Sequence, residues 1–222
     1  MSPAPDLLLV GAGGLGREVV ATLRVSDTGA RLGFLDDAIP IGTEIDGIPV
    51  VGPATADMAA ELPAAELVIC AASSGDPGRR RRLVERLGVP ANRYARIRHP
   101  AAVLDANEPG PGSIVLAGVV ATTAVTIGAH VVLMPSVVLV HDIVVDDFSV
   151  VASGVVLGGG VHIGAGAYVG AGSAVREGCS VGAGAVVGMG AVVVHDVPPG
   201  EVWVGNPARP LPRRDPEPDA SG

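Results

Sequence analysis

Residues 157–193 read LGGGVHIGAGAYVGAGSAVREGCSVGAGAVVGMGAVV, and an aliphatic residue returns in this stretch at every sixth position. The same register continues upstream to residue 127 without a break. Its members are Ile127, Leu133, Leu139, Val145, Val151, Leu157, Ile163, Val169, Val175, Val181, Val187 and Val193. A six-residue period with small residues at the bends predicts short strands that wind into a parallel β-helix, with the aliphatic side chains inside.

A second register of small or β-branched residues lies four positions after the first. Its members are Val131, Val137, Ile143, Ser149, Val155, Val161, Ala167, Ser173, Cys179, Ala185, Ala191 and Val197. We expect these side chains to fit the tight interior of the corners, which also explains why aromatic residues make up only 2% of the chain. Such a solenoid has outer faces without a core of their own, so its sites must form between molecules or beneath an added domain.

The N-terminal third predicts a smaller α/β unit. Residues 7–10 predict a buried strand, residues 11–16 read GAGGLG, and residues 17–23 have the apolar spacing of a helix. About twenty residues further on, a second short strand ends in Asp36 and Asp37, which are placed to hold a ribose. Backbone N–H groups at the start of the helix would then face phosphates.

A third strand at 67–72 and a helix at 79–87 complete a βαβαβ-like half of a dinucleotide-binding fold. Two interpretations of the glycine turn stay open, because a tight strand-to-helix connection needs glycine even without a ligand. The arginine run 79–82 could bind phosphate, although four arginines that open a helix more often form a solvated face.

We therefore predict a Rossmann-like nucleotide-binding domain over residues 1–98, a β-helix over 99–209 and a disordered tail over 210–222. The tail is rich in proline and has no periodicity.

Charge and cysteine content exclude several classes of protein. The chain has 23 acidic residues against 15 basic ones, and none of the basic ones is lysine, so we expect no nucleic-acid partner. Cys70 and Cys179 lie far apart, which indicates neither a disulfide framework nor a thiolate metal site and fits a reducing cytoplasm. The apolar run at 7–10 is too short for a signal sequence, and glycines interrupt every longer one, so we expect a cytoplasmic protein without a membrane span.

Histidine is the side chain whose proton affinity best suits a general base near neutral pH. His99, His130 and His162 stand at the domain junction or at hexad ends, where a solvent-facing or hinge role is expected. His141 and His195 are each followed by aspartate and lie 54 residues, or nine hexads, apart, which places them on one side of the β-helix if a coil takes eighteen residues. His195 leads into an exit loop, whereas further coils flank His141 on both sides.

Several short motifs are similar to those of one family. The hexads resemble the hexapeptide acyltransferases, and the other motifs look like sugar acetyltransferases of the sialic acid O-acetyltransferase type. That family includes N-acetyltransferases that act on UDP-4-amino sugars and on GDP-perosamine. The resemblance covers about residues 7–211 and is carried by GAGG at 11–14, FLDD at 34–37, HP at 99–100, LVHDIVVDDF at 139–148 and VGNPAR at 204–209.

The resemblance implies a left-handed parallel β-helix of eighteen residues per coil, and a homotrimer with its sites between subunits. It implies direct transfer of acetyl from acetyl-CoA to the amino group of a nucleotide-linked amino sugar, without a metal. The family's base corresponds to His141. Its neighbouring acid, which makes the histidine more basic, corresponds to Asp142, where some relatives have glutamate.

Ligand-binding residues are likewise implied by position. The acetyl-CoA groove carries over to Gly159, Gly170, Ala171 and Gly188, and the nucleotide-sugar pocket to Gly13, Gly14, Leu15, Asp36, Asp37 and Ala72. Three positions depart from relatives: Leu15 replaces a histidine of the glycine turn, Val150 a histidine near acetyl-CoA, and Met134 an asparagine near the base.

Other functions stay open at this point. The acceptor could be a sugar hydroxyl or a compound without a nucleotide. A carbonic anhydrase of the γ type also uses this helix, but the histidine spacing here contains no pair suited to zinc. A nicotinamide oxidoreductase would need a second catalytic module, and a scaffold without activity would not bind acetyl-CoA.

Overall fold

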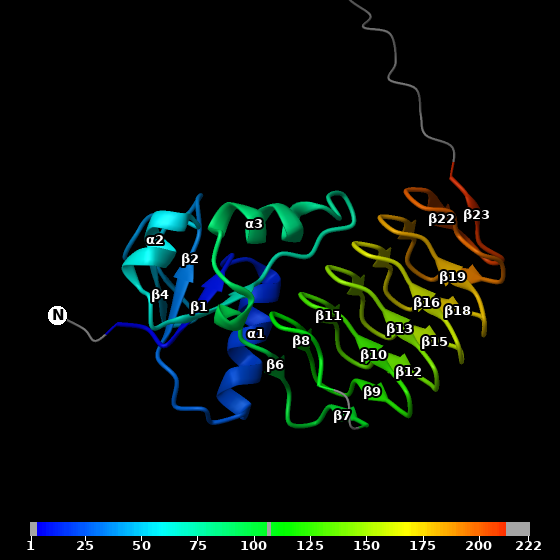
Figure 1. Cartoon of the computed structure of the whole chain (residues 1–222), viewed down its shortest axis with the longest axis horizontal. Helices are drawn as coiled ribbons and strands as arrows, with labels where there is room; N and C mark the ends of the chain where they lie inside the picture. The colour runs from blue at the N-terminus through cyan, green and yellow to red at the C-terminus, as the bar shows by residue number, and fades with distance from the viewer. Residues whose placement is uncertain (1–3, 106–107, 212–222) are drawn as a thin grey trace, which may run out of the picture.

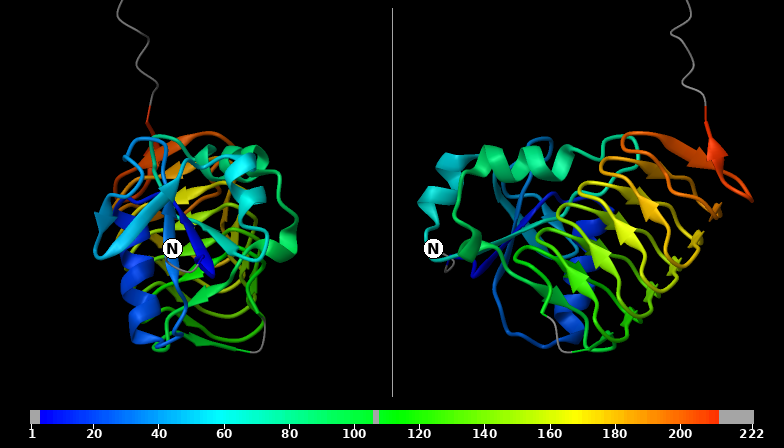
Figure 2. Two further views of the ribbon diagram at one scale, coloured as in Figure 1. Left: turned by 90° about the vertical axis from the view of Figure 1, so that its left-hand side faces the viewer. Right: turned by 45° about the vertical axis from the view of Figure 1, so that its right-hand side comes forward.

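The computed structural model describes residues 4–105 and 108–211, which form an α/β domain packed against a parallel β-helix (Figure 1). Two further views show the coils stacked away from the α/β domain, with the C-terminal strands at the far end (Figure 2). The predicted fold class, a Rossmann-like domain followed by a β-helix of hexapeptide repeats, is confirmed.

The α/β domain is built on a mostly parallel sheet with the strand order β3-β4-β2-β1-β5. Its strands are β1 (Leu7–Val10), β2 (Leu32–Leu35), β3 (Glu44–Ile45), β4 (Ile48–Gly52) and β5 (Glu66–Ile69). Its helices are α1 (Gly14–Val25), α2 (Ala56–Glu61), α3 (Arg79–Leu87) and the 3₁₀ helix η1 (Ala91–Arg93). Strand β1 lies between β2 and β5 and pairs in parallel with both. The carboxyl ends of these three strands therefore lie along one edge of the sheet.

The structure adds elements between residues 44 and 61 that the sequence pattern does not reveal. β4 extends the sheet in parallel beside β2, and β3 folds back on β4 as an antiparallel hairpin. Helix α2 begins after Thr55, whose hydroxyl accepts the backbone N–H of Met58. These elements are two to six residues long, and so short a segment carries no detectable periodicity.

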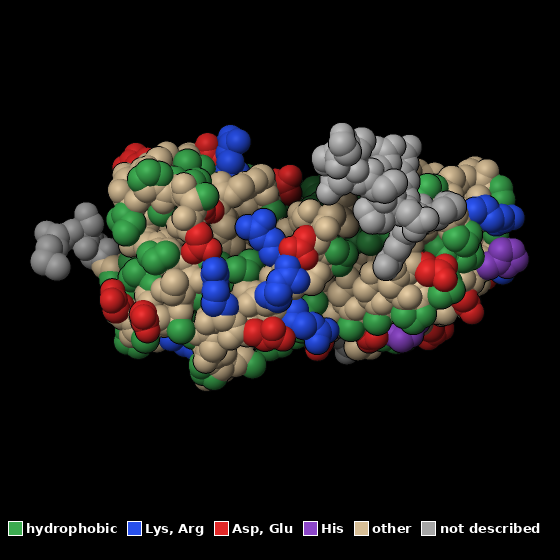
Figure 3. Space-filling view, turned by 90° about the horizontal axis from the view of Figure 1, so that it is seen from above, with side chains coloured by type: hydrophobic (Ala, Val, Ile, Leu, Met, Phe, Trp, Pro, Cys, Tyr) green, Lys and Arg blue, Asp and Glu red, His purple; other side chains and the backbone are tan. Residues whose placement is uncertain are grey.

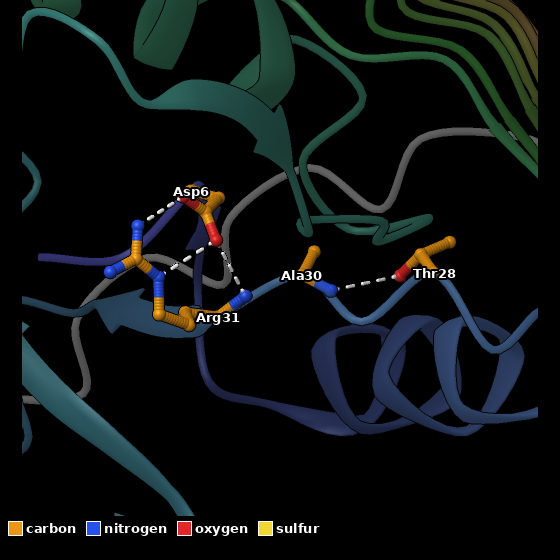
Figure 4. A network of polar contacts seen from close by, with 4 residues as sticks. All are labelled: Asp6, Thr28, Ala30 and Arg31. Carbon is orange, nitrogen blue, oxygen red and sulfur yellow. Dashed lines mark hydrogen bonds and ion pairs between the residues drawn. The ribbon is translucent and has the colours of Figure 1, made fainter. Parts of the chain in front are cut away.

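An ion pair ties the start of β1 to the start of β2. The Arg31 guanidinium donates to the two carboxylate oxygens of Asp6 at 2.5 and 2.9 Å, and the Arg31 backbone N–H donates to the same group at 2.9 Å (Figure 4). The hydrogen bonds from Arg31 hold the pKa of Asp6 far below its usual value. Because both side chains are exposed, the pair aligns the strands more than it stabilises the fold.

The β-helix is a prism, and the described residues form its three faces from short, mainly parallel strands. The first face contains β6 (Ile97–Arg98), β8 (Ile114–Val115), β11 (Val132–Leu133), β14 (Val150–Val151), β17 (Tyr168–Val169), β20 (Val186–Val187), β22 (Val202–Val204) and β23 (Arg209–Pro210). The second face contains β7 (Val103–Leu104), β9 (Val120–Ala121), β12 (Val138–Leu139), β15 (Val156–Leu157), β18 (Ala174–Val175) and β21 (Val192–Val193). The third face contains β10 (Thr126–Ile127), β13 (Val144–Val145), β16 (His162–Ile163) and β19 (Ser180–Val181).

A regular coil takes eighteen residues, because strands between the two ends of the β-helix pair with the strand eighteen positions later, as Thr126 does with Val144. The aliphatic register predicted from the sequence is confirmed, since all twelve of its residues belong to one buried core. The second register is buried as well. Its two serines, Ser149 and Ser173, satisfy their hydroxyls by donating to backbone carbonyls at 2.9 and 2.7 Å.

Glycines serve the coils in two ways. Gly166, with a φ of +68°, adopts the left-handed conformation that turns the chain from one face to the next. Gly164 lies outside that conformation but directly under the next coil, where a Cβ would lie only 2.6 Å from the backbone nitrogen of Ala183. The glycine that follows the aliphatic residue in many hexads is therefore required because the backbones of adjacent coils touch.

The α/β domain covers the N-terminal part of the first face of the prism. Outward-pointing side chains of this face pack with the apolar side of α1 in a second core. The members from the first face are Ile97, Ile114, Val132 and Val150, and those from α1 are Leu15, Val19, Val20 and Leu23. Valines of the other two faces are exposed, namely Val103 by 61%, Val156 by 46% and Val144 by 38%.

The C-terminal end of the β-helix is closed by β22 and β23, which pair antiparallel. Trp203 lies at the end of the core and donates its indole N–H to Glu201 at 2.7 Å. Of the tail that the sequence predicts to be disordered, Pro210 belongs to β23, and the Leu211 N–H donates to the Val202 carbonyl at 2.7 Å. The rest of that tail, 212–222, lies outside the described residues.

The contact between coils predicts the effect of Gly164→Ala. The added methyl group meets backbone that cannot rotate away, so we expect the free energy of unfolding to fall by roughly 1–3 kcal/mol and the Tm to fall by several degrees. Thermal unfolding followed by circular dichroism measures the change. The neighbouring Ala165→Ser is the control and should melt like wild type; equal melting of both variants would contradict the close stacking.

Candidate functional site

A pocket of about 430 Å³ opens at the carboxyl ends of β1, β2 and β5. All its lining residues lie between residues 10 and 86, so the pocket belongs to the α/β domain. The carboxyl edge of parallel strands, beside a helix N-terminus, is where such folds usually bind nucleotides. The structure brings together around this pocket every residue that the sequence assigns to the nucleotide sugar: Gly13, Gly14, Leu15, Asp36, Asp37 and Ala72.

The glycine turn between β1 and α1 contains glycines of two kinds. Gly11 has a φ of +107°, and a Cβ there would lie 3.0 Å from the carbonyl oxygen of Cys70. A Cβ on Gly16 would collide with the Gly11 carbonyl oxygen. These two glycines are required by the turn itself. Gly13 and Gly14 would have no atom within 4 Å of a Cβ, so packing does not explain them, and both line the pocket.

Helix α1 directs its N-terminus at this pocket. The residue before it, Gly13, provides no side-chain cap, and the first turn contains no acidic residue. The first backbone N–H groups of a helix have no partner within the helix, and the helix dipole adds partial positive charge there. The arrangement suits a negatively charged ligand.

The two acids that follow β2 are held by the protein. Asp36 accepts the backbone N–H of Ala12, inside the glycine turn, and a second backbone N–H, each at 2.9 Å. Asp37 accepts the backbone N–H of Ala54 at 2.9 Å and pairs with Arg86 at 2.8 Å. Burial raises the pKa of Asp37, but these two hydrogen bonds outweigh it and keep the pKa below its usual value. Each carboxylate oxygen can accept a further hydrogen bond, such as one from a ribose hydroxyl.

The arginine run 79–82 does not form a simple solvated face. Arg80 is only 1% exposed, and its guanidinium donates to the carbonyls of Ile69 at 2.7 Å and Ala71 at 2.9 Å, at the end of β5. It also donates to the carbonyl of His130 in the β-helix at 2.9 Å. The expectation of a solvated face is wrong for Arg80, because this side chain joins the two parts of the chain.

His130 lies at the corner between the third and first faces and is 5% exposed. Its ring stacks on Phe148 at a centroid distance of 5.1 Å and meets the edge of the Tyr94 ring at 4.6 Å. Burial, with a smaller effect of Arg80, lowers the pKa of His130 to about 4 against the opposing effect of Asp147. A solvent-facing role for His130 is therefore wrong, since the residue packs where the two parts of the chain meet.

His141 follows β12 at the corner between the second and third faces, and its side chain is 62% exposed. Its Nδ1 lies 2.9 Å from a carboxylate oxygen of Asp142, which turns the corner with a φ of +58°. Gly159 occupies the same corner one coil further on. A Cβ on Gly159 would lie 2.6 Å from Nε2 of His141 and closer still to Cε1. The missing side chain at Gly159 thus makes room for the imidazole, a role that the sequence pattern does not reveal.

Two further histidines lie on the same side of the prism. His195 occupies the His141 corner three coils further on, as the 54-residue spacing predicts, and is exposed. His162 lies on the third face, with Nε2 2.8 Å from a carboxylate oxygen of Asp146. Pairing with a carboxylate therefore does not distinguish His141 from His162. His141 is distinguished by Gly159 in the next coil, which has no side chain and so leaves space for the imidazole ring.

The residues assigned to acetyl-CoA flank the second face of the prism. Gly170, Ala171 and Gly188 lie at its corner with the first face, and a Cβ on Gly170 would lie 2.7 Å from the carbonyl carbon of Gly188. Gly159 lies at the other corner, beside His141. The structure thus separates Gly159 from the other three by the width of one face.

The positions that depart from relatives lie elsewhere. Val150 and Met134 pack at the junction with the α/β domain, with Val150 on the first face. They are therefore not neighbours of the His141 corner.

The pocket and the His141 corner lie on opposite sides of the chain. The α/β domain packs on the first face. The His141 corner lies between the second and third faces, which is the edge opposite the first face. The pocket lining includes no residue of the second or third face. The described residues of one chain therefore do not unite the pocket and His141 in a single site.

No cluster of three or more His, Cys, Asp or Glu side chains within residues 4–105 and 108–211 could hold a metal ion. In the same part of the chain, no helix has the length and apolar character needed to cross a membrane.

Known proteins share this architecture. The family model of the PglD N-terminal domain matches residues 6–87. The acetyltransferase domain of PglB from Neisseria gonorrhoeae, solved with acetyl coenzyme A, is 30% identical with a TM-score of 0.82, over 92% of this chain and 98% of that one. WeeI from Acinetobacter baumannii is 30% identical with a TM-score of 0.78, over 92% and 99%. PerB from Caulobacter crescentus, solved with CoA and GDP-perosamine, is 26% identical with a TM-score of 0.83, over 95% and 100%. No curated protein matches the sequence significantly.

The likeness to these acetyltransferases over nearly the whole of each chain places the protein among the hexapeptide-repeat acyltransferases. The chain belongs to the family of sugar acetyltransferases that the PglD N-terminal domain characterises, and it is an enzyme of the acyltransferase class.

The lowered pKa of His130 predicts how stability depends on pH. The unfolded chain takes up a proton near pH 6.5, whereas the folded protein holds His130 neutral down to about pH 4. The unfolded state therefore binds more protons in this interval, so the free energy of unfolding falls as the pH is lowered from 6.5 to 4. His130→Phe keeps an aromatic ring on Phe148 and removes the titration.

Thermal unfolding of both proteins at pH 7 and pH 4.5 tests this prediction. The wild type should lose more stability between the two values than His130→Phe. An equal loss would show that His130 does not titrate in this interval.

Proposed function

We propose that the chain transfers the acetyl group of acetyl-CoA to the amino group of a nucleotide-linked amino sugar. The observation that carries the proposal is the presence, in one chain, of a pocket suited to a nucleotide and of the exposed His141–Asp142 pair on a hexapeptide β-helix. The ligands of two relatives support it, because the PglB domain was solved with acetyl coenzyme A and PerB with CoA and GDP-perosamine.

The geometry of His141 suits a general base. When Nδ1 donates its hydrogen to Asp142, Nε2 carries the free lone pair. Nε2 takes a proton from the amine as the amine nitrogen attacks the thioester carbonyl carbon, and a backbone N–H stabilises the resulting oxyanion. The carbon–sulfur bond then breaks, and the imidazolium returns the proton to sulfur, so CoA leaves as the thiol.

Direct transfer needs no nucleophile from the protein, and neither cysteine is suited to supply one. Cys179 is buried in the core of the β-helix. Burial raises the pKa of the Cys70 thiol to about 12, so this group stays protonated at neutral pH.

The second face offers a path for acetyl-CoA. In this proposal the pantetheine chain crosses that face between Gly170, Ala171 and Gly188 at one corner and Gly159 at the other, which brings the thioester to His141. Small residues at both corners leave the backbone open to the amides of the cofactor.

A second copy of the chain completes the site in this proposal, and we expect a homotrimer. One argument is the separation of the pocket from the His141 corner within a single chain. The other is the second face, whose outward side chains form an unbroken apolar ladder beside that corner. Its members are Val103, Val120, Val138, Val156, Ala174 and Val192.

Release of the CoA thiol, detected with a chromogenic disulfide, tests the reaction. The acceptors are UDP-, dTDP- and GDP-linked 4-amino sugars and their 4-hydroxy counterparts. We expect release with an amino sugar and a loss of about 10²–10⁴-fold in kcat for His141→Ala. Release with the hydroxy sugars alone would replace N-acetylation by O-acetylation. An unchanged rate in His141→Ala would reject His141 as the base.

Gly159→Ala serves as a matched variant in the same assay. The added methyl group displaces the His141 ring, so we expect kcat to fall by about 10–100-fold. In the His141→Ala background the same change should have no further effect, because the ring is already gone. A further loss in the double variant would indicate that Gly159 acts through acetyl-CoA instead.

Mixing two inactive variants tests the shared site. His141→Ala keeps the pocket, and Gly13→Phe fills the pocket without displacing packed atoms. Each variant alone should be inactive, whereas mixed trimers should regain about a quarter of the activity, since one in four interfaces then pairs two intact parts. If activity does not recover although subunit exchange is confirmed, the pocket and His141 act together within one chain.

The oligomeric state is measured separately by light scattering, which should give three times the chain mass of 22.0 kDa.

A further inference from the structure

Most of the charges on the wall of the α/β pocket are satisfied by the protein. Within the described residues its charged side chains are Asp36, Asp37, Arg79 and Arg86. Both oxygens of Asp36 accept backbone N–H groups, and Asp37 pairs with Arg86 at 2.8 Å. Arg79 is the exception. In the described part of the chain its side chain makes no hydrogen bond or ion pair.

The arginines that follow Arg79 in α3 each have a partner. Arg80 is buried and donates to three backbone carbonyls. Arg81 lies over the Phe148 ring, 4.8 Å from its centroid, and Arg82 pairs with Asp76. Figure 3 looks onto the side of the molecule where α3 lies and shows basic side chains gathered there among acidic ones. The positive charge of Arg79 helps to lower the pKa of Asp37 across the pocket. Arg79 differs from its neighbours because it lines the pocket while its guanidinium makes no hydrogen bond or ion pair with the described residues.

Arg79 shares the pocket with the start of α1. Gly13 and Gly14 leave open space there, and the first turn of α1 contains no acid that would neutralise the helix N-terminus. Arg79 also lines the adjoining crevice that leads toward Tyr168 of the first face. The pocket thus combines partial positive charge from a backbone with a full positive charge from a guanidinium. Asp36 and Asp37, which can accept hydroxyl groups, complete its polar lining.

We propose that Arg79 binds the diphosphate of the nucleotide-linked substrate, together with the N-terminus of α1. A guanidinium presents a planar pair of donors that matches two phosphate oxygens, and neither Arg86, which Asp37 already engages, nor the apolar Leu15 could replace it. Arg79 is thus a substrate-binding residue that selects for the phosphates. The assignment rests on the proposed function, because it presumes a nucleotide-linked acceptor.

Titration with UDP, dTDP, GDP and the corresponding nucleosides tests this assignment. We expect Arg79→Gln to weaken binding of the preferred nucleoside diphosphate by about 10-fold or more and to leave nucleoside binding unchanged. In the transfer assay, KM for the nucleotide sugar should rise by a similar factor, while kcat and KM for acetyl-CoA stay constant. Arg79→Lys should restore part of the affinity.

Arg82→Gln is the matched control, because it removes one charge from the same helix outside the pocket and should bind like wild type. Equal diphosphate binding by Arg79→Gln and wild type would overturn the role of Arg79 and leave the proposed function intact. Equal weakening in Arg79→Gln and Arg82→Gln would also overturn it, since a general charge effect would explain both. If the wild type binds none of the diphosphates but still releases thiol with an unlinked amino sugar, both the nucleotide acceptor and this inference fail.

Discussion

The backbone of each coil of the β-helix packs directly against the backbone of the next coil, and the core and the arrangement of surface residues depend on this contact. It requires a continuous ladder of aliphatic residues inside and glycine wherever two backbones meet, as at Gly164 under Ala183. Because of this stacking, residues eighteen positions apart in the sequence lie next to one another in adjacent coils. His141 and Gly159 are neighbours only for this reason, although seventeen residues separate them in the chain. The site is therefore a consequence of the same stacking that stabilises the core.

The junction with the α/β domain decides which surfaces of the prism are free. Helix α1 covers the outward side chains of the first face, and the buried guanidinium of Arg80 links the end of β5 to the β-helix. Arg80 has no acidic partner: its Nε and one terminal nitrogen donate to carbonyl oxygens, which favour the charged form, while the other buried terminal nitrogen has no hydrogen-bond partner. Burial lowers the pKa of Arg80 only to about 10. His130 beside it stays neutral near physiological pH, because burial, with a smaller effect of the Arg80 charge, lowers its pKa to about 4.

Once the first face is covered, the chemistry divides between two regions. In the proposed function, the α/β pocket offers donors for phosphate and acceptors for hydroxyl groups, whereas the His141 corner supplies the base and the second face binds acetyl-CoA. Neither region holds all the groups that acyl transfer needs. The apolar ladder of the second face and the division of the site have one common explanation in the proposed trimer, in which the pocket of one chain faces the corner of another. In that trimer, one contact between chains would both bury the apolar ladder and bring the pocket to His141.

The sequence by itself determined the elements that repeat or that follow strong local rules. Twelve hexads in one register predicted the β-helix and its core, and the strand-glycine-helix pattern predicted the glycine turn with Asp36 and Asp37. The other pocket residues were implied by the resemblance to the sugar acetyltransferases. Periodicity is local, so it could not indicate the short β3, β4 and α2 or the burial of Arg80 and His130, which meet across 50 residues of chain. Nor could it separate Gly11 and Gly16, which the turn requires, from Gly13 and Gly14, which face the pocket. Only the tertiary structure decided these points, because each depends on what packs against a residue from a distant part of the chain.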